Sequence, residues 1–347
     1  MITKKKIRKL TPQQEVKLLQ KALGYVCFQE DETSVYEHLD LGNPDANELL
    51  GDRELGMRWG CIVELHGPNS SGKTWLATRI SAIAQQQDEH VYVAKADLEG
   101  SNDDRFNEKV GIDLQRFYLF KASLAVSVQE LAKIDALRKK KAEGGKLTTL
   151  QEEKLATPPE AYEQSAEQVC DEIEAWIKFR HVRDPRAKIV LIIDSVTGML
   201  VSEEDEGHLS DQNMRTKVSL ASFLSLLCRR WVRLASNYKV IMLFINQERE
   251  APGVMYGSPI RTSGGNALKF YAVVRVRIRR SGNGRILKDK KMIGLRSILL
   301  NEKNKVGGRE GGELAFKGYP RTGKWSWISK EQADKESAAG RKAKVKK

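Results

Sequence analysis

The sequence predicts an α/β fold with a mostly parallel, twisted sheet flanked by helices. Short apolar runs rich in β-branched residues alternate with segments of helical periodicity, and such runs suit strands that are buried on both faces. Strands that alternate with helices favour a parallel sheet. The four runs are Cys61–Leu65, Val91–Ala94, Ile189–Ile193 and Val240–Ile245. Three later strands with hairpin-like connections predict a C-terminal antiparallel extension: Val273–Ile278, Arg296–Leu300 and Glu313–Phe316.

The composition is that of a globular protein with a sizeable core. The chain has 347 residues, of which 40% are hydrophobic and 30% charged, which excludes wholesale disorder, collagen and a disulfide miniprotein. No run of 18 or more apolar residues occurs, and no apolar stretch follows the basic N-terminus, so we expect neither a membrane span nor a signal peptide. The 4 cysteines are too widely spaced for a CxxC site, which favours free thiols and a reducing cytoplasm.

Positive charge gathers at the two ends of the sequence. The formal net charge is +13, with 59 Lys and Arg against 46 Asp and Glu, and residues 1–10 and 330–347 together supply +9 of it. A basic tail either attracts nucleic acid or simply stays solvated. Charge alone therefore leaves nucleic-acid binding open.

Three regions are expected along the chain. Residues 1–50 form an N-terminal segment with helical spacing over residues 12–23, and residues 321–347 form a short C-terminal element and a basic tail. Residues 51–320 form the core, which is interrupted at about 121–156 by an inserted helical hairpin. Apolar residues recur at helical spacing in this insertion from Leu124 onwards, and a Gly-Gly pair then breaks the pattern.

A phosphate-binding loop is the clearest short motif. Gly67–Thr74 reads Gly-Pro-Asn-Ser-Ser-Gly-Lys-Thr and matches G-x-x-x-x-G-K-[ST] in full. The predicted strand before it and a helical pattern over Trp75–Ala84 after it supply the strand–loop–helix order in which backbone N–H groups hold phosphates. The alternative is a Gly-rich turn with a surface lysine. The residues expected to bind ATP are Gly67, Pro68, Asn69, Ser70, Ser71, Gly72, Lys73, Thr74 and Trp75.

Four side chains have predicted chemical roles at or near this loop. Lys73 would reach the β- and γ-phosphates, and Thr74 would hold Mg²⁺. Asp194 ends an apolar strand and can orient the same ion directly or through water, although such an aspartate is often only a cap. Hydrolysis also needs a carboxylate that activates water. Glu99, which follows the strand Val91–Ala94, is the candidate, and a solvated acid in a turn is the alternative.

Two longer strings are more specific than the phosphate loop. Val240–Gln247 reads VIMLFINQ, and Gly264–Ala272 reads GGNALKFYA. Together with the phosphate-loop segment that starts at Val63, they resemble the RecA recombinase family over roughly residues 48–317, apart from the insertion. The resemblance implies a P-loop NTPase core of the RecA type, ATP and Mg²⁺ as cofactors, and a cytoplasmic location in a bacterial or phage-infected cell. The unusual flanks favour a bacteriophage member.

The resemblance also implies roles for residues around the nucleotide. It places the catalytic glutamate at Glu99 and the adenine pocket at Asp103 and Phe106. Gln247 falls on the γ-phosphate sensor at the mouth of the second DNA loop, where such an amide can bind the phosphate and order the loop. A hydrogen-bonded amide at a strand end is the alternative.

A pair of lysines is implied to act on the neighbouring subunit. Lys303 and Lys305 resemble the family's lysines that reach the γ-phosphate of an adjacent protomer and stabilise transition-state charge. ATP would then lie at the subunit interface of a helical homo-oligomeric filament. The resemblance implies that the N-terminal segment of residues 1–50 packs on the adjacent protomer and mediates this oligomerisation, and packing on its own domain is the alternative. The alternative for Lys303-Asn-Lys305 is a solvated basic turn.

Two loops are implied to bind DNA, one spanning about Ser202–Arg215 and one spanning Glu248–Ser263. Basic side chains would neutralise phosphates, and apolar or aromatic ones would contact bases. Paired glycines that open a helix would bind a phosphate through backbone amides. The residues concerned are Met214, Arg215, Lys217, Arg249, Met255, Tyr256, Arg261, Gly264 and Gly265. The second loop begins Glu248-Arg-Glu-Ala-Pro252, which is more acidic and stiffer than usual in the family and weakens the case for its DNA contacts. Glu203–Glu206 in the first loop would repel a phosphate that lies close to them.

The implied function is that of an ATP-dependent DNA recombinase. It would form filaments on single-stranded DNA, take up homologous duplex DNA and promote pairing and strand exchange in recombination and repair. The acidic loop residues favour the alternative, a RecA-like accessory or mediator ATPase that binds DNA or a recombinase without strand exchange. The string Gly264–Ala272 argues against a hexameric helicase, and an intact Lys73, Thr74 and Glu99 argue against a non-catalytic DNA-coating protein.

Overall fold

The computed structural model describes most of the chain after residue 35. Within the described part, the chain forms one compact unit from His38 to the C-terminus. The predicted N-terminal helical segment up to residue 35 and most of both predicted DNA loops lie outside the described residues. The residues described are 36–121, 124–125, 128–143, 145, 147–156, 162–199, 201, 214–250, 260–289 and 291–345.

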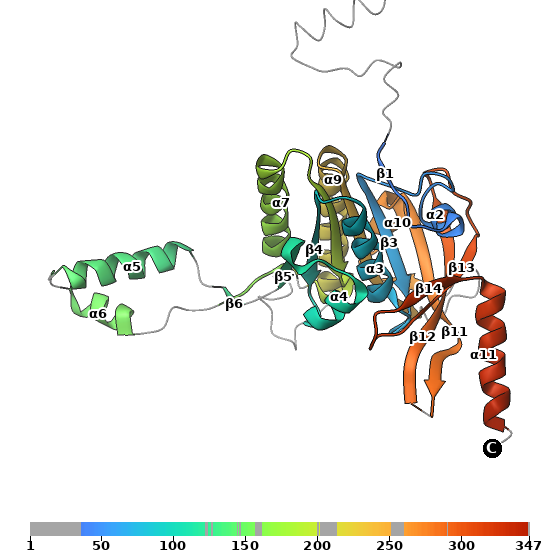
Figure 1. Cartoon of the computed structure of the whole chain (residues 1–347). Helices are drawn as coiled ribbons and strands as arrows, with labels where there is room; N and C mark the ends of the chain where they lie inside the picture. Colours follow the sequence, from blue (N-terminus) through green and yellow to red (C-terminus); the bar gives the residue numbers. More distant parts are fainter. Residues whose placement is uncertain are drawn as a thin grey trace, which may run out of the picture. The chain divides into compact units, whose positions relative to one another are not determined.

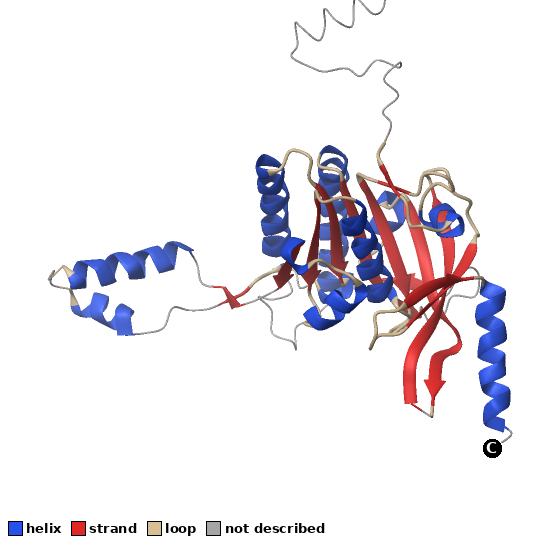
Figure 2. Cartoon of the chain, viewed as in Figure 1, coloured by secondary structure: helices blue, strands red, loops and turns tan. Residues whose placement is uncertain are grey.

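Ten strands form the central sheet. They are β3 (Cys61–Gly67), β4 (Val91–Asp97), β5 (Phe117–Lys121), β8 (Lys188–Asp194), β9 (Val240–Glu250), β10 (Ile260–Thr262), β11 (Val274–Lys288), β12 (Lys291–Asn304), β13 (Glu313–Gly318) and β14 (Trp325–Ile328). Their order is β14-β13-β12-β11-β3-β9-β8-β4-β5, with β10 paired to β9 (Figures 1 and 2). Neighbours from β11 to β5 are parallel, and those from β11 to β14 are antiparallel. The predicted parallel sheet with an antiparallel extension is therefore confirmed.

The helices cover the two faces of this sheet. They are α2 (Pro44–Leu50), α3 (Lys73–Gln87), α4 (Asp104–Val110), α7 (Ala166–Arg183), α9 (Met214–Asn237), α10 (Ala267–Tyr271) and α11 (Lys330–Val345). The short strands β1 (His38–Leu39) and β2 (Met57–Arg58) pair with each other. Residues 330–345, expected only as part of a basic tail, thus form α11, which packs on β11, β12 and β13.

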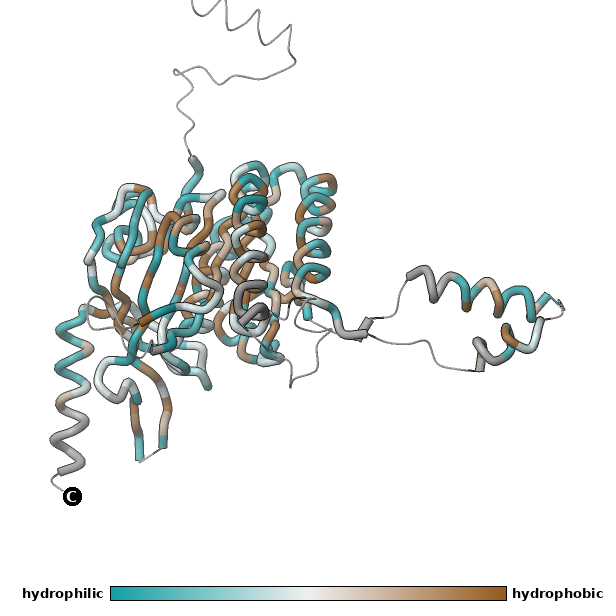
Figure 3. The backbone as a smooth tube through the Cα atoms, turned by 180° about the vertical axis from the view of Figure 1, so that it is seen from behind, coloured by the Kyte–Doolittle hydropathy of each residue, from teal (hydrophilic) through white to brown (hydrophobic). Residues whose placement is uncertain are grey.

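The pleat of the central strands explains the two hydrophobic layers. Successive side chains of a strand point to opposite faces. In β8, Val190 and Ile192 pack in the layer that contains α3, whereas Ile189, Leu191 and Ile193 pack in the layer that contains α7 and α9. Figure 3 shows hydrophobic residues along the central strands. Burial on both faces is why these strands read as continuous apolar runs in the sequence.

The inserted segment contains two helices, α5 (Val128–Ala142) and α6 (Thr149–Ala156), which pack against each other. One detail of the prediction is wrong. Leu124 lies in a short strand, β6 (Leu124–Ala125), and the helix begins only at Val128. Leu124 pairs with Glu163 of β7 (Tyr162–Glu163). The backbone pairing of the two strands, and not the helical spacing of the apolar residues, therefore determines the conformation of Leu124. The division of the chain into three regions stays a prediction.

The three cysteines in the described part of the chain agree with the expectation of free thiols. Cys61, Cys170 and Cys228 are buried and make no disulfide. Burial raises the pKa of the Cys61 thiol to about 12, so this thiol stays protonated at neutral pH. Among the described residues, every helix is too short or too polar to cross a lipid bilayer.

Candidate nucleotide and DNA site

The carboxyl ends of neighbouring parallel strands bring the predicted residues to one edge of the sheet. The register places Gly67 at the end of β3 opposite Gln247 of β9, and Asp97 at the end of β4 opposite Asp194 of β8. Open α/β sheets bind their ligands at this edge. The phosphate loop therefore starts beside the strand that carries the predicted γ-phosphate sensor.

A cleft of about 430 Å³ lies at this edge. Ten of its lining residues are predicted site residues: Asn69, Ser70, Ser71, Gly72, Lys73, Thr74, Trp75, Glu99, Asp194 and Gln247. The other five are Ser195, Ile245, Arg280, Met292 and Leu295. The fold thus gathers the loop, the candidate base and the candidate sensor around one cavity large enough for a phosphate chain.

The phosphate loop closes around its own lysine. Lys73 Nζ donates hydrogen bonds of 2.9 Å to the carbonyl oxygens of Gly67 and Pro68. Burial lowers the pKa of Lys73, although the carboxylates of Asp194 and Glu99 oppose this effect. Gly72 precedes α3 with a φ of 97°, in the left-handed region that favours glycine. An added Cβ there would also come within 3.0 Å of the side chains of Phe316 and Ser297.

The predicted magnesium residues meet directly. Thr74 Oγ1 donates a 3.0 Å hydrogen bond to Asp194 Oδ2. A hydroxyl and a carboxylate are ligands that Mg²⁺ accepts, and Ser71 adds a buried hydroxyl without a protein partner. The described residues contain no group of three or more His, Cys, Asp or Glu that could hold a metal alone. Substrate phosphates and water would therefore have to complete the coordination, as is usual for Mg²⁺.

Lys95 is a residue that the sequence analysis missed. It lies inside the apolar strand β4, and its Nζ lies 3.2 Å from Asp194 Oδ2, with both side chains 3% exposed. Burial raises the pKa of Asp194, while Lys95 and Thr74 act in the opposite direction. A lysine in an otherwise apolar strand was the available signal, because a buried lysine requires a partner.

The candidate base and the candidate sensor are hydrogen-bonded to each other. Gln247 Nε2 donates a 2.9 Å bond to Glu99 Oε1. The Ser195 hydroxyl also donates to this oxygen. Ser195 was missed by the sequence analysis, although it directly follows Asp194. The carboxylate that would activate water is thus in direct contact with the amide that would detect the γ-phosphate.

The adenine-pocket residues lie beside the cleft rather than in its lining. Asp103 caps α4 by accepting hydrogen bonds from the backbone N–H groups of Arg105 and Phe106. Phe106 packs edge-on against Trp75, with ring centroids 5.4 Å apart. Trp75 links this pair to the phosphate loop. The adenine contact of Asp103 and Phe106 stays a prediction.

Lys303 and Lys305 do not line the phosphate-loop cleft of their own chain. Lys303 Nζ instead donates to the carbonyl oxygens of Lys269 and Phe270, at 2.8 and 3.0 Å. Burial lowers the pKa of Lys303, and Lys305 beside it adds to this effect. Lysines that serve a neighbouring subunit must lie away from their own loop, so the predicted role is retained as a prediction.

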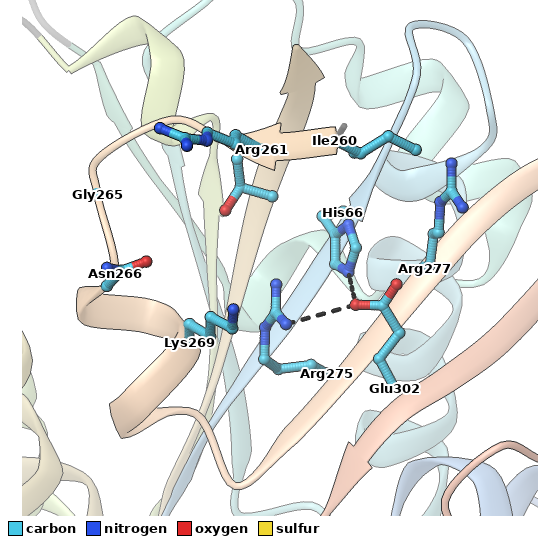
Figure 4. A pocket seen from close by; sticks show the side chains of 10 residues that line it. His66, Ile260, Arg261, Gly265, Asn266, Lys269, Arg275, Arg277 and Glu302 are labelled. Carbon is cyan, nitrogen blue, oxygen red and sulfur yellow. Dashed lines mark hydrogen bonds and ion pairs between the residues drawn. The ribbon is translucent and has the colours of Figure 1, made fainter. Parts of the chain in front are cut away.

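A second cleft, of about 730 Å³, lies where β10 and α10 meet the sheet (Figure 4). Its lining is His66, Ile260, Arg261, Thr262, Gly265, Asn266, Lys269, Arg275, Arg277 and Glu302. Arg261 lies directly opposite Arg249 on the paired strands. Like charges on directly opposite residues of two strands repel each other. An anionic ligand that binds both arginines would remove this repulsion. Gly264 and Gly265, which come after β10, have φ of 80° and 72°, in the left-handed region that favours glycine.

The base of the second predicted loop is more ordered than the sequence indicated. Glu248–Ser263 was predicted as a loop, but β9 continues to Glu250 and pairs with β10. Antiparallel backbone pairing outweighs the acidic and glycine-containing composition of this segment. Glu248 does not face outward: its side chain is 8% exposed and binds His66 and Arg277. Glu248 is therefore not an exposed acid of the loop surface, and its charge does not count against DNA contacts of this loop.

Several predicted DNA contacts lie outside the described residues. Met255 and Tyr256 belong to residues 251–259, and the first loop is outside from residue 202 to residue 213. Met214, Arg215 and Lys217 lie in α9, so the first loop ends earlier than predicted. The structure describes the backbone of these three residues but not their side chains, and their DNA contacts stay predictions.

Two kinds of comparison with known proteins bear on the family of this chain. The family model of the RecA N-terminal domain matches residues 30–142 and 152–309. Protein RecA of Mannheimia haemolytica is 32% identical over 312 residues, which cover 86% of this chain and 69% of that protein. Protein RecA of Haemophilus ducreyi is 32% identical over 311 residues, covering 86% and 68%. The unmatched residues 143–151 lie around the turn between α5 and α6, so the match extends through most of the predicted insertion. The chain belongs to the RecA family of recombinases.

Proposed function

We propose that this protein is a DNA-dependent ATPase that polymerises on single-stranded DNA and promotes homologous pairing and strand exchange with duplex DNA. The observation that carries the proposal is the contact between Glu99 and Gln247 beside the phosphate loop. This contact joins the candidate hydrolytic carboxylate to the strand that leads into the second DNA loop. ATP and Mg²⁺ are the substrate and the ion that fit the cleft.

Five residues of the cleft have a defined chemical task in this proposal. Lys73 exchanges its loop carbonyls for phosphate oxygens and neutralises their charge. Thr74 and Asp194 hold Mg²⁺, which would supply further neutralisation of the phosphates. When a γ-phosphate is present, the Gln247 amide turns to it and releases Glu99. The freed carboxylate then accepts a proton from the attacking water.

Filament assembly completes the site in this proposal. Lys303 and Lys305 are supplied by the adjacent protomer and stabilise the charge that develops on the transferred phosphoryl group. Hydrolysis is therefore slow for isolated protomers and rises when DNA aligns them. The γ-phosphate holds Gln247, and with it the second loop, in the DNA-binding state until hydrolysis releases both.

The first test is ATP hydrolysis with and without single-stranded DNA. Wild-type protein is expected to show strong stimulation by DNA, and Lys73→Ala to lose it, because no other side chain of the loop brings a positive charge to the phosphates. Lys178→Ala, an exposed lysine on α7, is the matched control and keeps the wild-type rate. Hydrolysis that is indifferent to DNA would contradict the proposed function.

The two opposed arginines give a second prediction. Arg249→Ala and Arg261→Ala are each expected to weaken single-stranded DNA binding uniformly across sequences, because they contact phosphates rather than bases. Each variant should reduce the slope of log affinity against log salt by about 0.7, the value for one phosphate contact on a single strand. Fluorescence anisotropy at several salt concentrations measures the slope. Arg186→Ala, at an exposed turn, is the control, and an unchanged slope in both test variants would exclude these contacts.

The alternative of an accessory ATPase loses part of its support. It depended on acidic residues in the DNA loops, and Glu248 is neutralised by Arg277 and His66. A strand-exchange assay with homologous circular single strands and linear duplex separates the two functions. Joint molecules formed by this protein alone support the recombinase. DNA-stimulated hydrolysis without joint molecules supports the accessory protein.

A further inference from the structure

A network of charged side chains, most of them buried, lies behind the phosphate loop. Its centre is His66 on β3, whose side chain is 3% exposed. We call the network the His66 cluster, and its members are Glu64, His66, Glu248, Arg275, Arg277 and Glu302. Figure 4 shows His66, Arg275 and Glu302 in contact at the wall of the 730 Å³ cleft, which gives the cluster access to solvent.

The geometry around the imidazole calls for a proton on both ring nitrogens. His66 Nδ1 lies 3.1 Å from Glu248 Oε1, and Nε2 lies 3.0 Å from Glu302 Oε2. A neutral imidazole donates from only one nitrogen and would turn a lone pair towards the other carboxylate. The imidazolium donates from both. Two carboxylates on opposite sides of one buried ring therefore favour the charged form.

The charge balance of the cluster leads to the same result. Three carboxylates face two guanidinium groups, which leaves one negative charge without a partner unless His66 is protonated. Arg277 holds Glu248 with two hydrogen bonds of 2.8 and 3.2 Å, and Arg275 contacts Glu64 at 2.5 Å and Glu302 at 3.4 Å. Arg261 and Lys269 line the same cleft, but in the described structure neither is ion-paired with a carboxylate of the cluster. Lys73 and Lys303 interact electrostatically with Glu248 and Glu64, again without an ion pair. A buried group without a charge partner is costly, so neutrality favours the imidazolium.

Burial and the neighbouring carboxylates have opposite effects on the pKa of His66. Burial is the largest single effect and lowers it. The hydrogen bonds with Glu248 and Glu302, together with the charges of Glu64 and Glu302, outweigh burial, so the pKa of His66 is raised above its ordinary value. Burial acts to raise the pKa of Glu248, but the contacts with His66 and Arg277 outweigh it, so this pKa is lowered. The hydrogen bond with His66 is the main cause of the lowered pKa of Glu302.

The positions of the three central residues connect separate parts of the site. His66 immediately precedes Gly67, where the phosphate loop begins. Glu248 immediately follows Gln247 and lies opposite Thr262, at the base of the second DNA loop. Glu302 immediately precedes Lys303. One imidazole thus joins the nucleotide strand, the loop strand and the strand of the subunit-spanning lysine.

We propose that His66 is a positioning residue whose protonated ring holds the base of the second DNA loop and the Lys303 strand against the phosphate loop, so that DNA-stimulated ATP turnover weakens when the ring loses its proton. The proposal rests on the proposed function for its effect on turnover. The link itself is a property of the protein without ligands and is measurable separately.

The direction of the pH effect follows from the raised pKa. A histidine with a raised folded-state pKa contributes its full stabilisation below its unfolded pKa of about 6.5. That contribution is lost as pH rises through the folded-state value. The link is therefore complete in mildly acidic solution and weakens on the alkaline side.

The test compares His66→Gln with wild type at saturating single-stranded DNA from about pH 6 to 9, the range in which histidines titrate. Wild-type turnover should fall about fivefold or more across the titration, the lower end of usual coupling between sites. Turnover by His66→Gln should be low at every pH and should not show this fall. Glu302→Gln removes one partner of the imidazolium at a partly exposed position. The fall in turnover of this variant should therefore occur at lower pH than in wild type.

His90→Gln is the matched control. His90 Nδ1 also contacts a carboxylate, Asp184, at 2.7 Å, but it lies just before the start of β4, at the opposite edge of the sheet. This variant should keep the wild-type pH profile. If His66→Gln and Glu302→Gln also keep that profile, His66 plays no part in coupling and the proposal is overturned.

Thermal unfolding of the ligand-free protein separates this proposal from the proposed function. The difference in unfolding midpoint between wild type and His66→Gln should be large near pH 6 and shrink towards pH 9. A difference that does not change with pH overturns the protonated link, whatever the enzyme assays show. A pH-dependent difference in a protein that hydrolyses no ATP with DNA supports the link and refutes the recombinase function alone.

Discussion

Glu99→Gln is expected to abolish ATP hydrolysis while ATP binding is retained. Loss of a general base costs about 10²- to 10⁴-fold in rate, because the amide cannot accept the proton of the attacking water. The substitution keeps the shape of the side chain. Its amide oxygen can still accept the hydrogen bonds that Gln247 and Ser195 donate to Glu99. The loss should therefore fall on the chemical step and leave the cleft intact.

Single-turnover hydrolysis and equilibrium nucleotide binding distinguish the chemical step from affinity. Glu99→Gln should hold ATP on the protein and stabilise the DNA-bound filament, because the γ-phosphate persists. Glu89→Gln replaces a side chain that is 87% exposed at the other edge of the sheet and serves as the control. A Glu99→Gln rate close to that of wild type would assign the activation of water to another group.

The parts of the fold that the sequence predicted are those with local signals. Each central strand is an apolar run because both of its faces are covered, and this pattern is readable without knowing the neighbours. The phosphate loop is equally local, since its glycines and its lysine act within eight residues. The parallel order then brings Glu99, Asp194 and Gln247 to one edge, because strand ends meet there in any parallel sheet.

The contacts that the sequence did not predict join residues far apart in the chain. His66 contacts Glu248 and Glu302, which lie on two other strands of the sheet. Lys95 contacts Asp194 on the neighbouring strand. Nothing in a local pattern specifies which charged residues of different strands lie side by side. For this reason the sequence placed Glu248 in a loop, whereas the pairing of the strands buries its side chain.

Local signals also failed where two of them competed. Leu124 has the spacing of a helix, but strand pairing with Glu163 removes it from α5. A side chain that can serve two purposes is assigned by its surroundings, which the sequence does not display.

Two inactive variants are expected to restore hydrolysis when they are mixed. Lys73→Ala has a defective phosphate loop and intact Lys303 and Lys305, whereas the double variant Lys303→Ala/Lys305→Ala has the reverse. Each alone should lose activity, the second by about 10³- to 10⁵-fold if the lysines act as an arginine finger does. In a mixed head-to-tail filament, about a quarter of the interfaces join an intact loop to intact lysines.

The mixing experiment tests where the lysines act, because the single variants cannot. Neither lysine lines the cleft of its own chain, and Lys303 contacts the end of α10 instead. Recovered, DNA-dependent hydrolysis in the mixture requires a site that spans two protomers. Lys288→Ala/Lys291→Ala, at the tip between β11 and β12, is the control and should be active alone. A mixture as inactive as its components would place the lysines outside the intersubunit site, and DNA stimulation would then need a cause within one protomer.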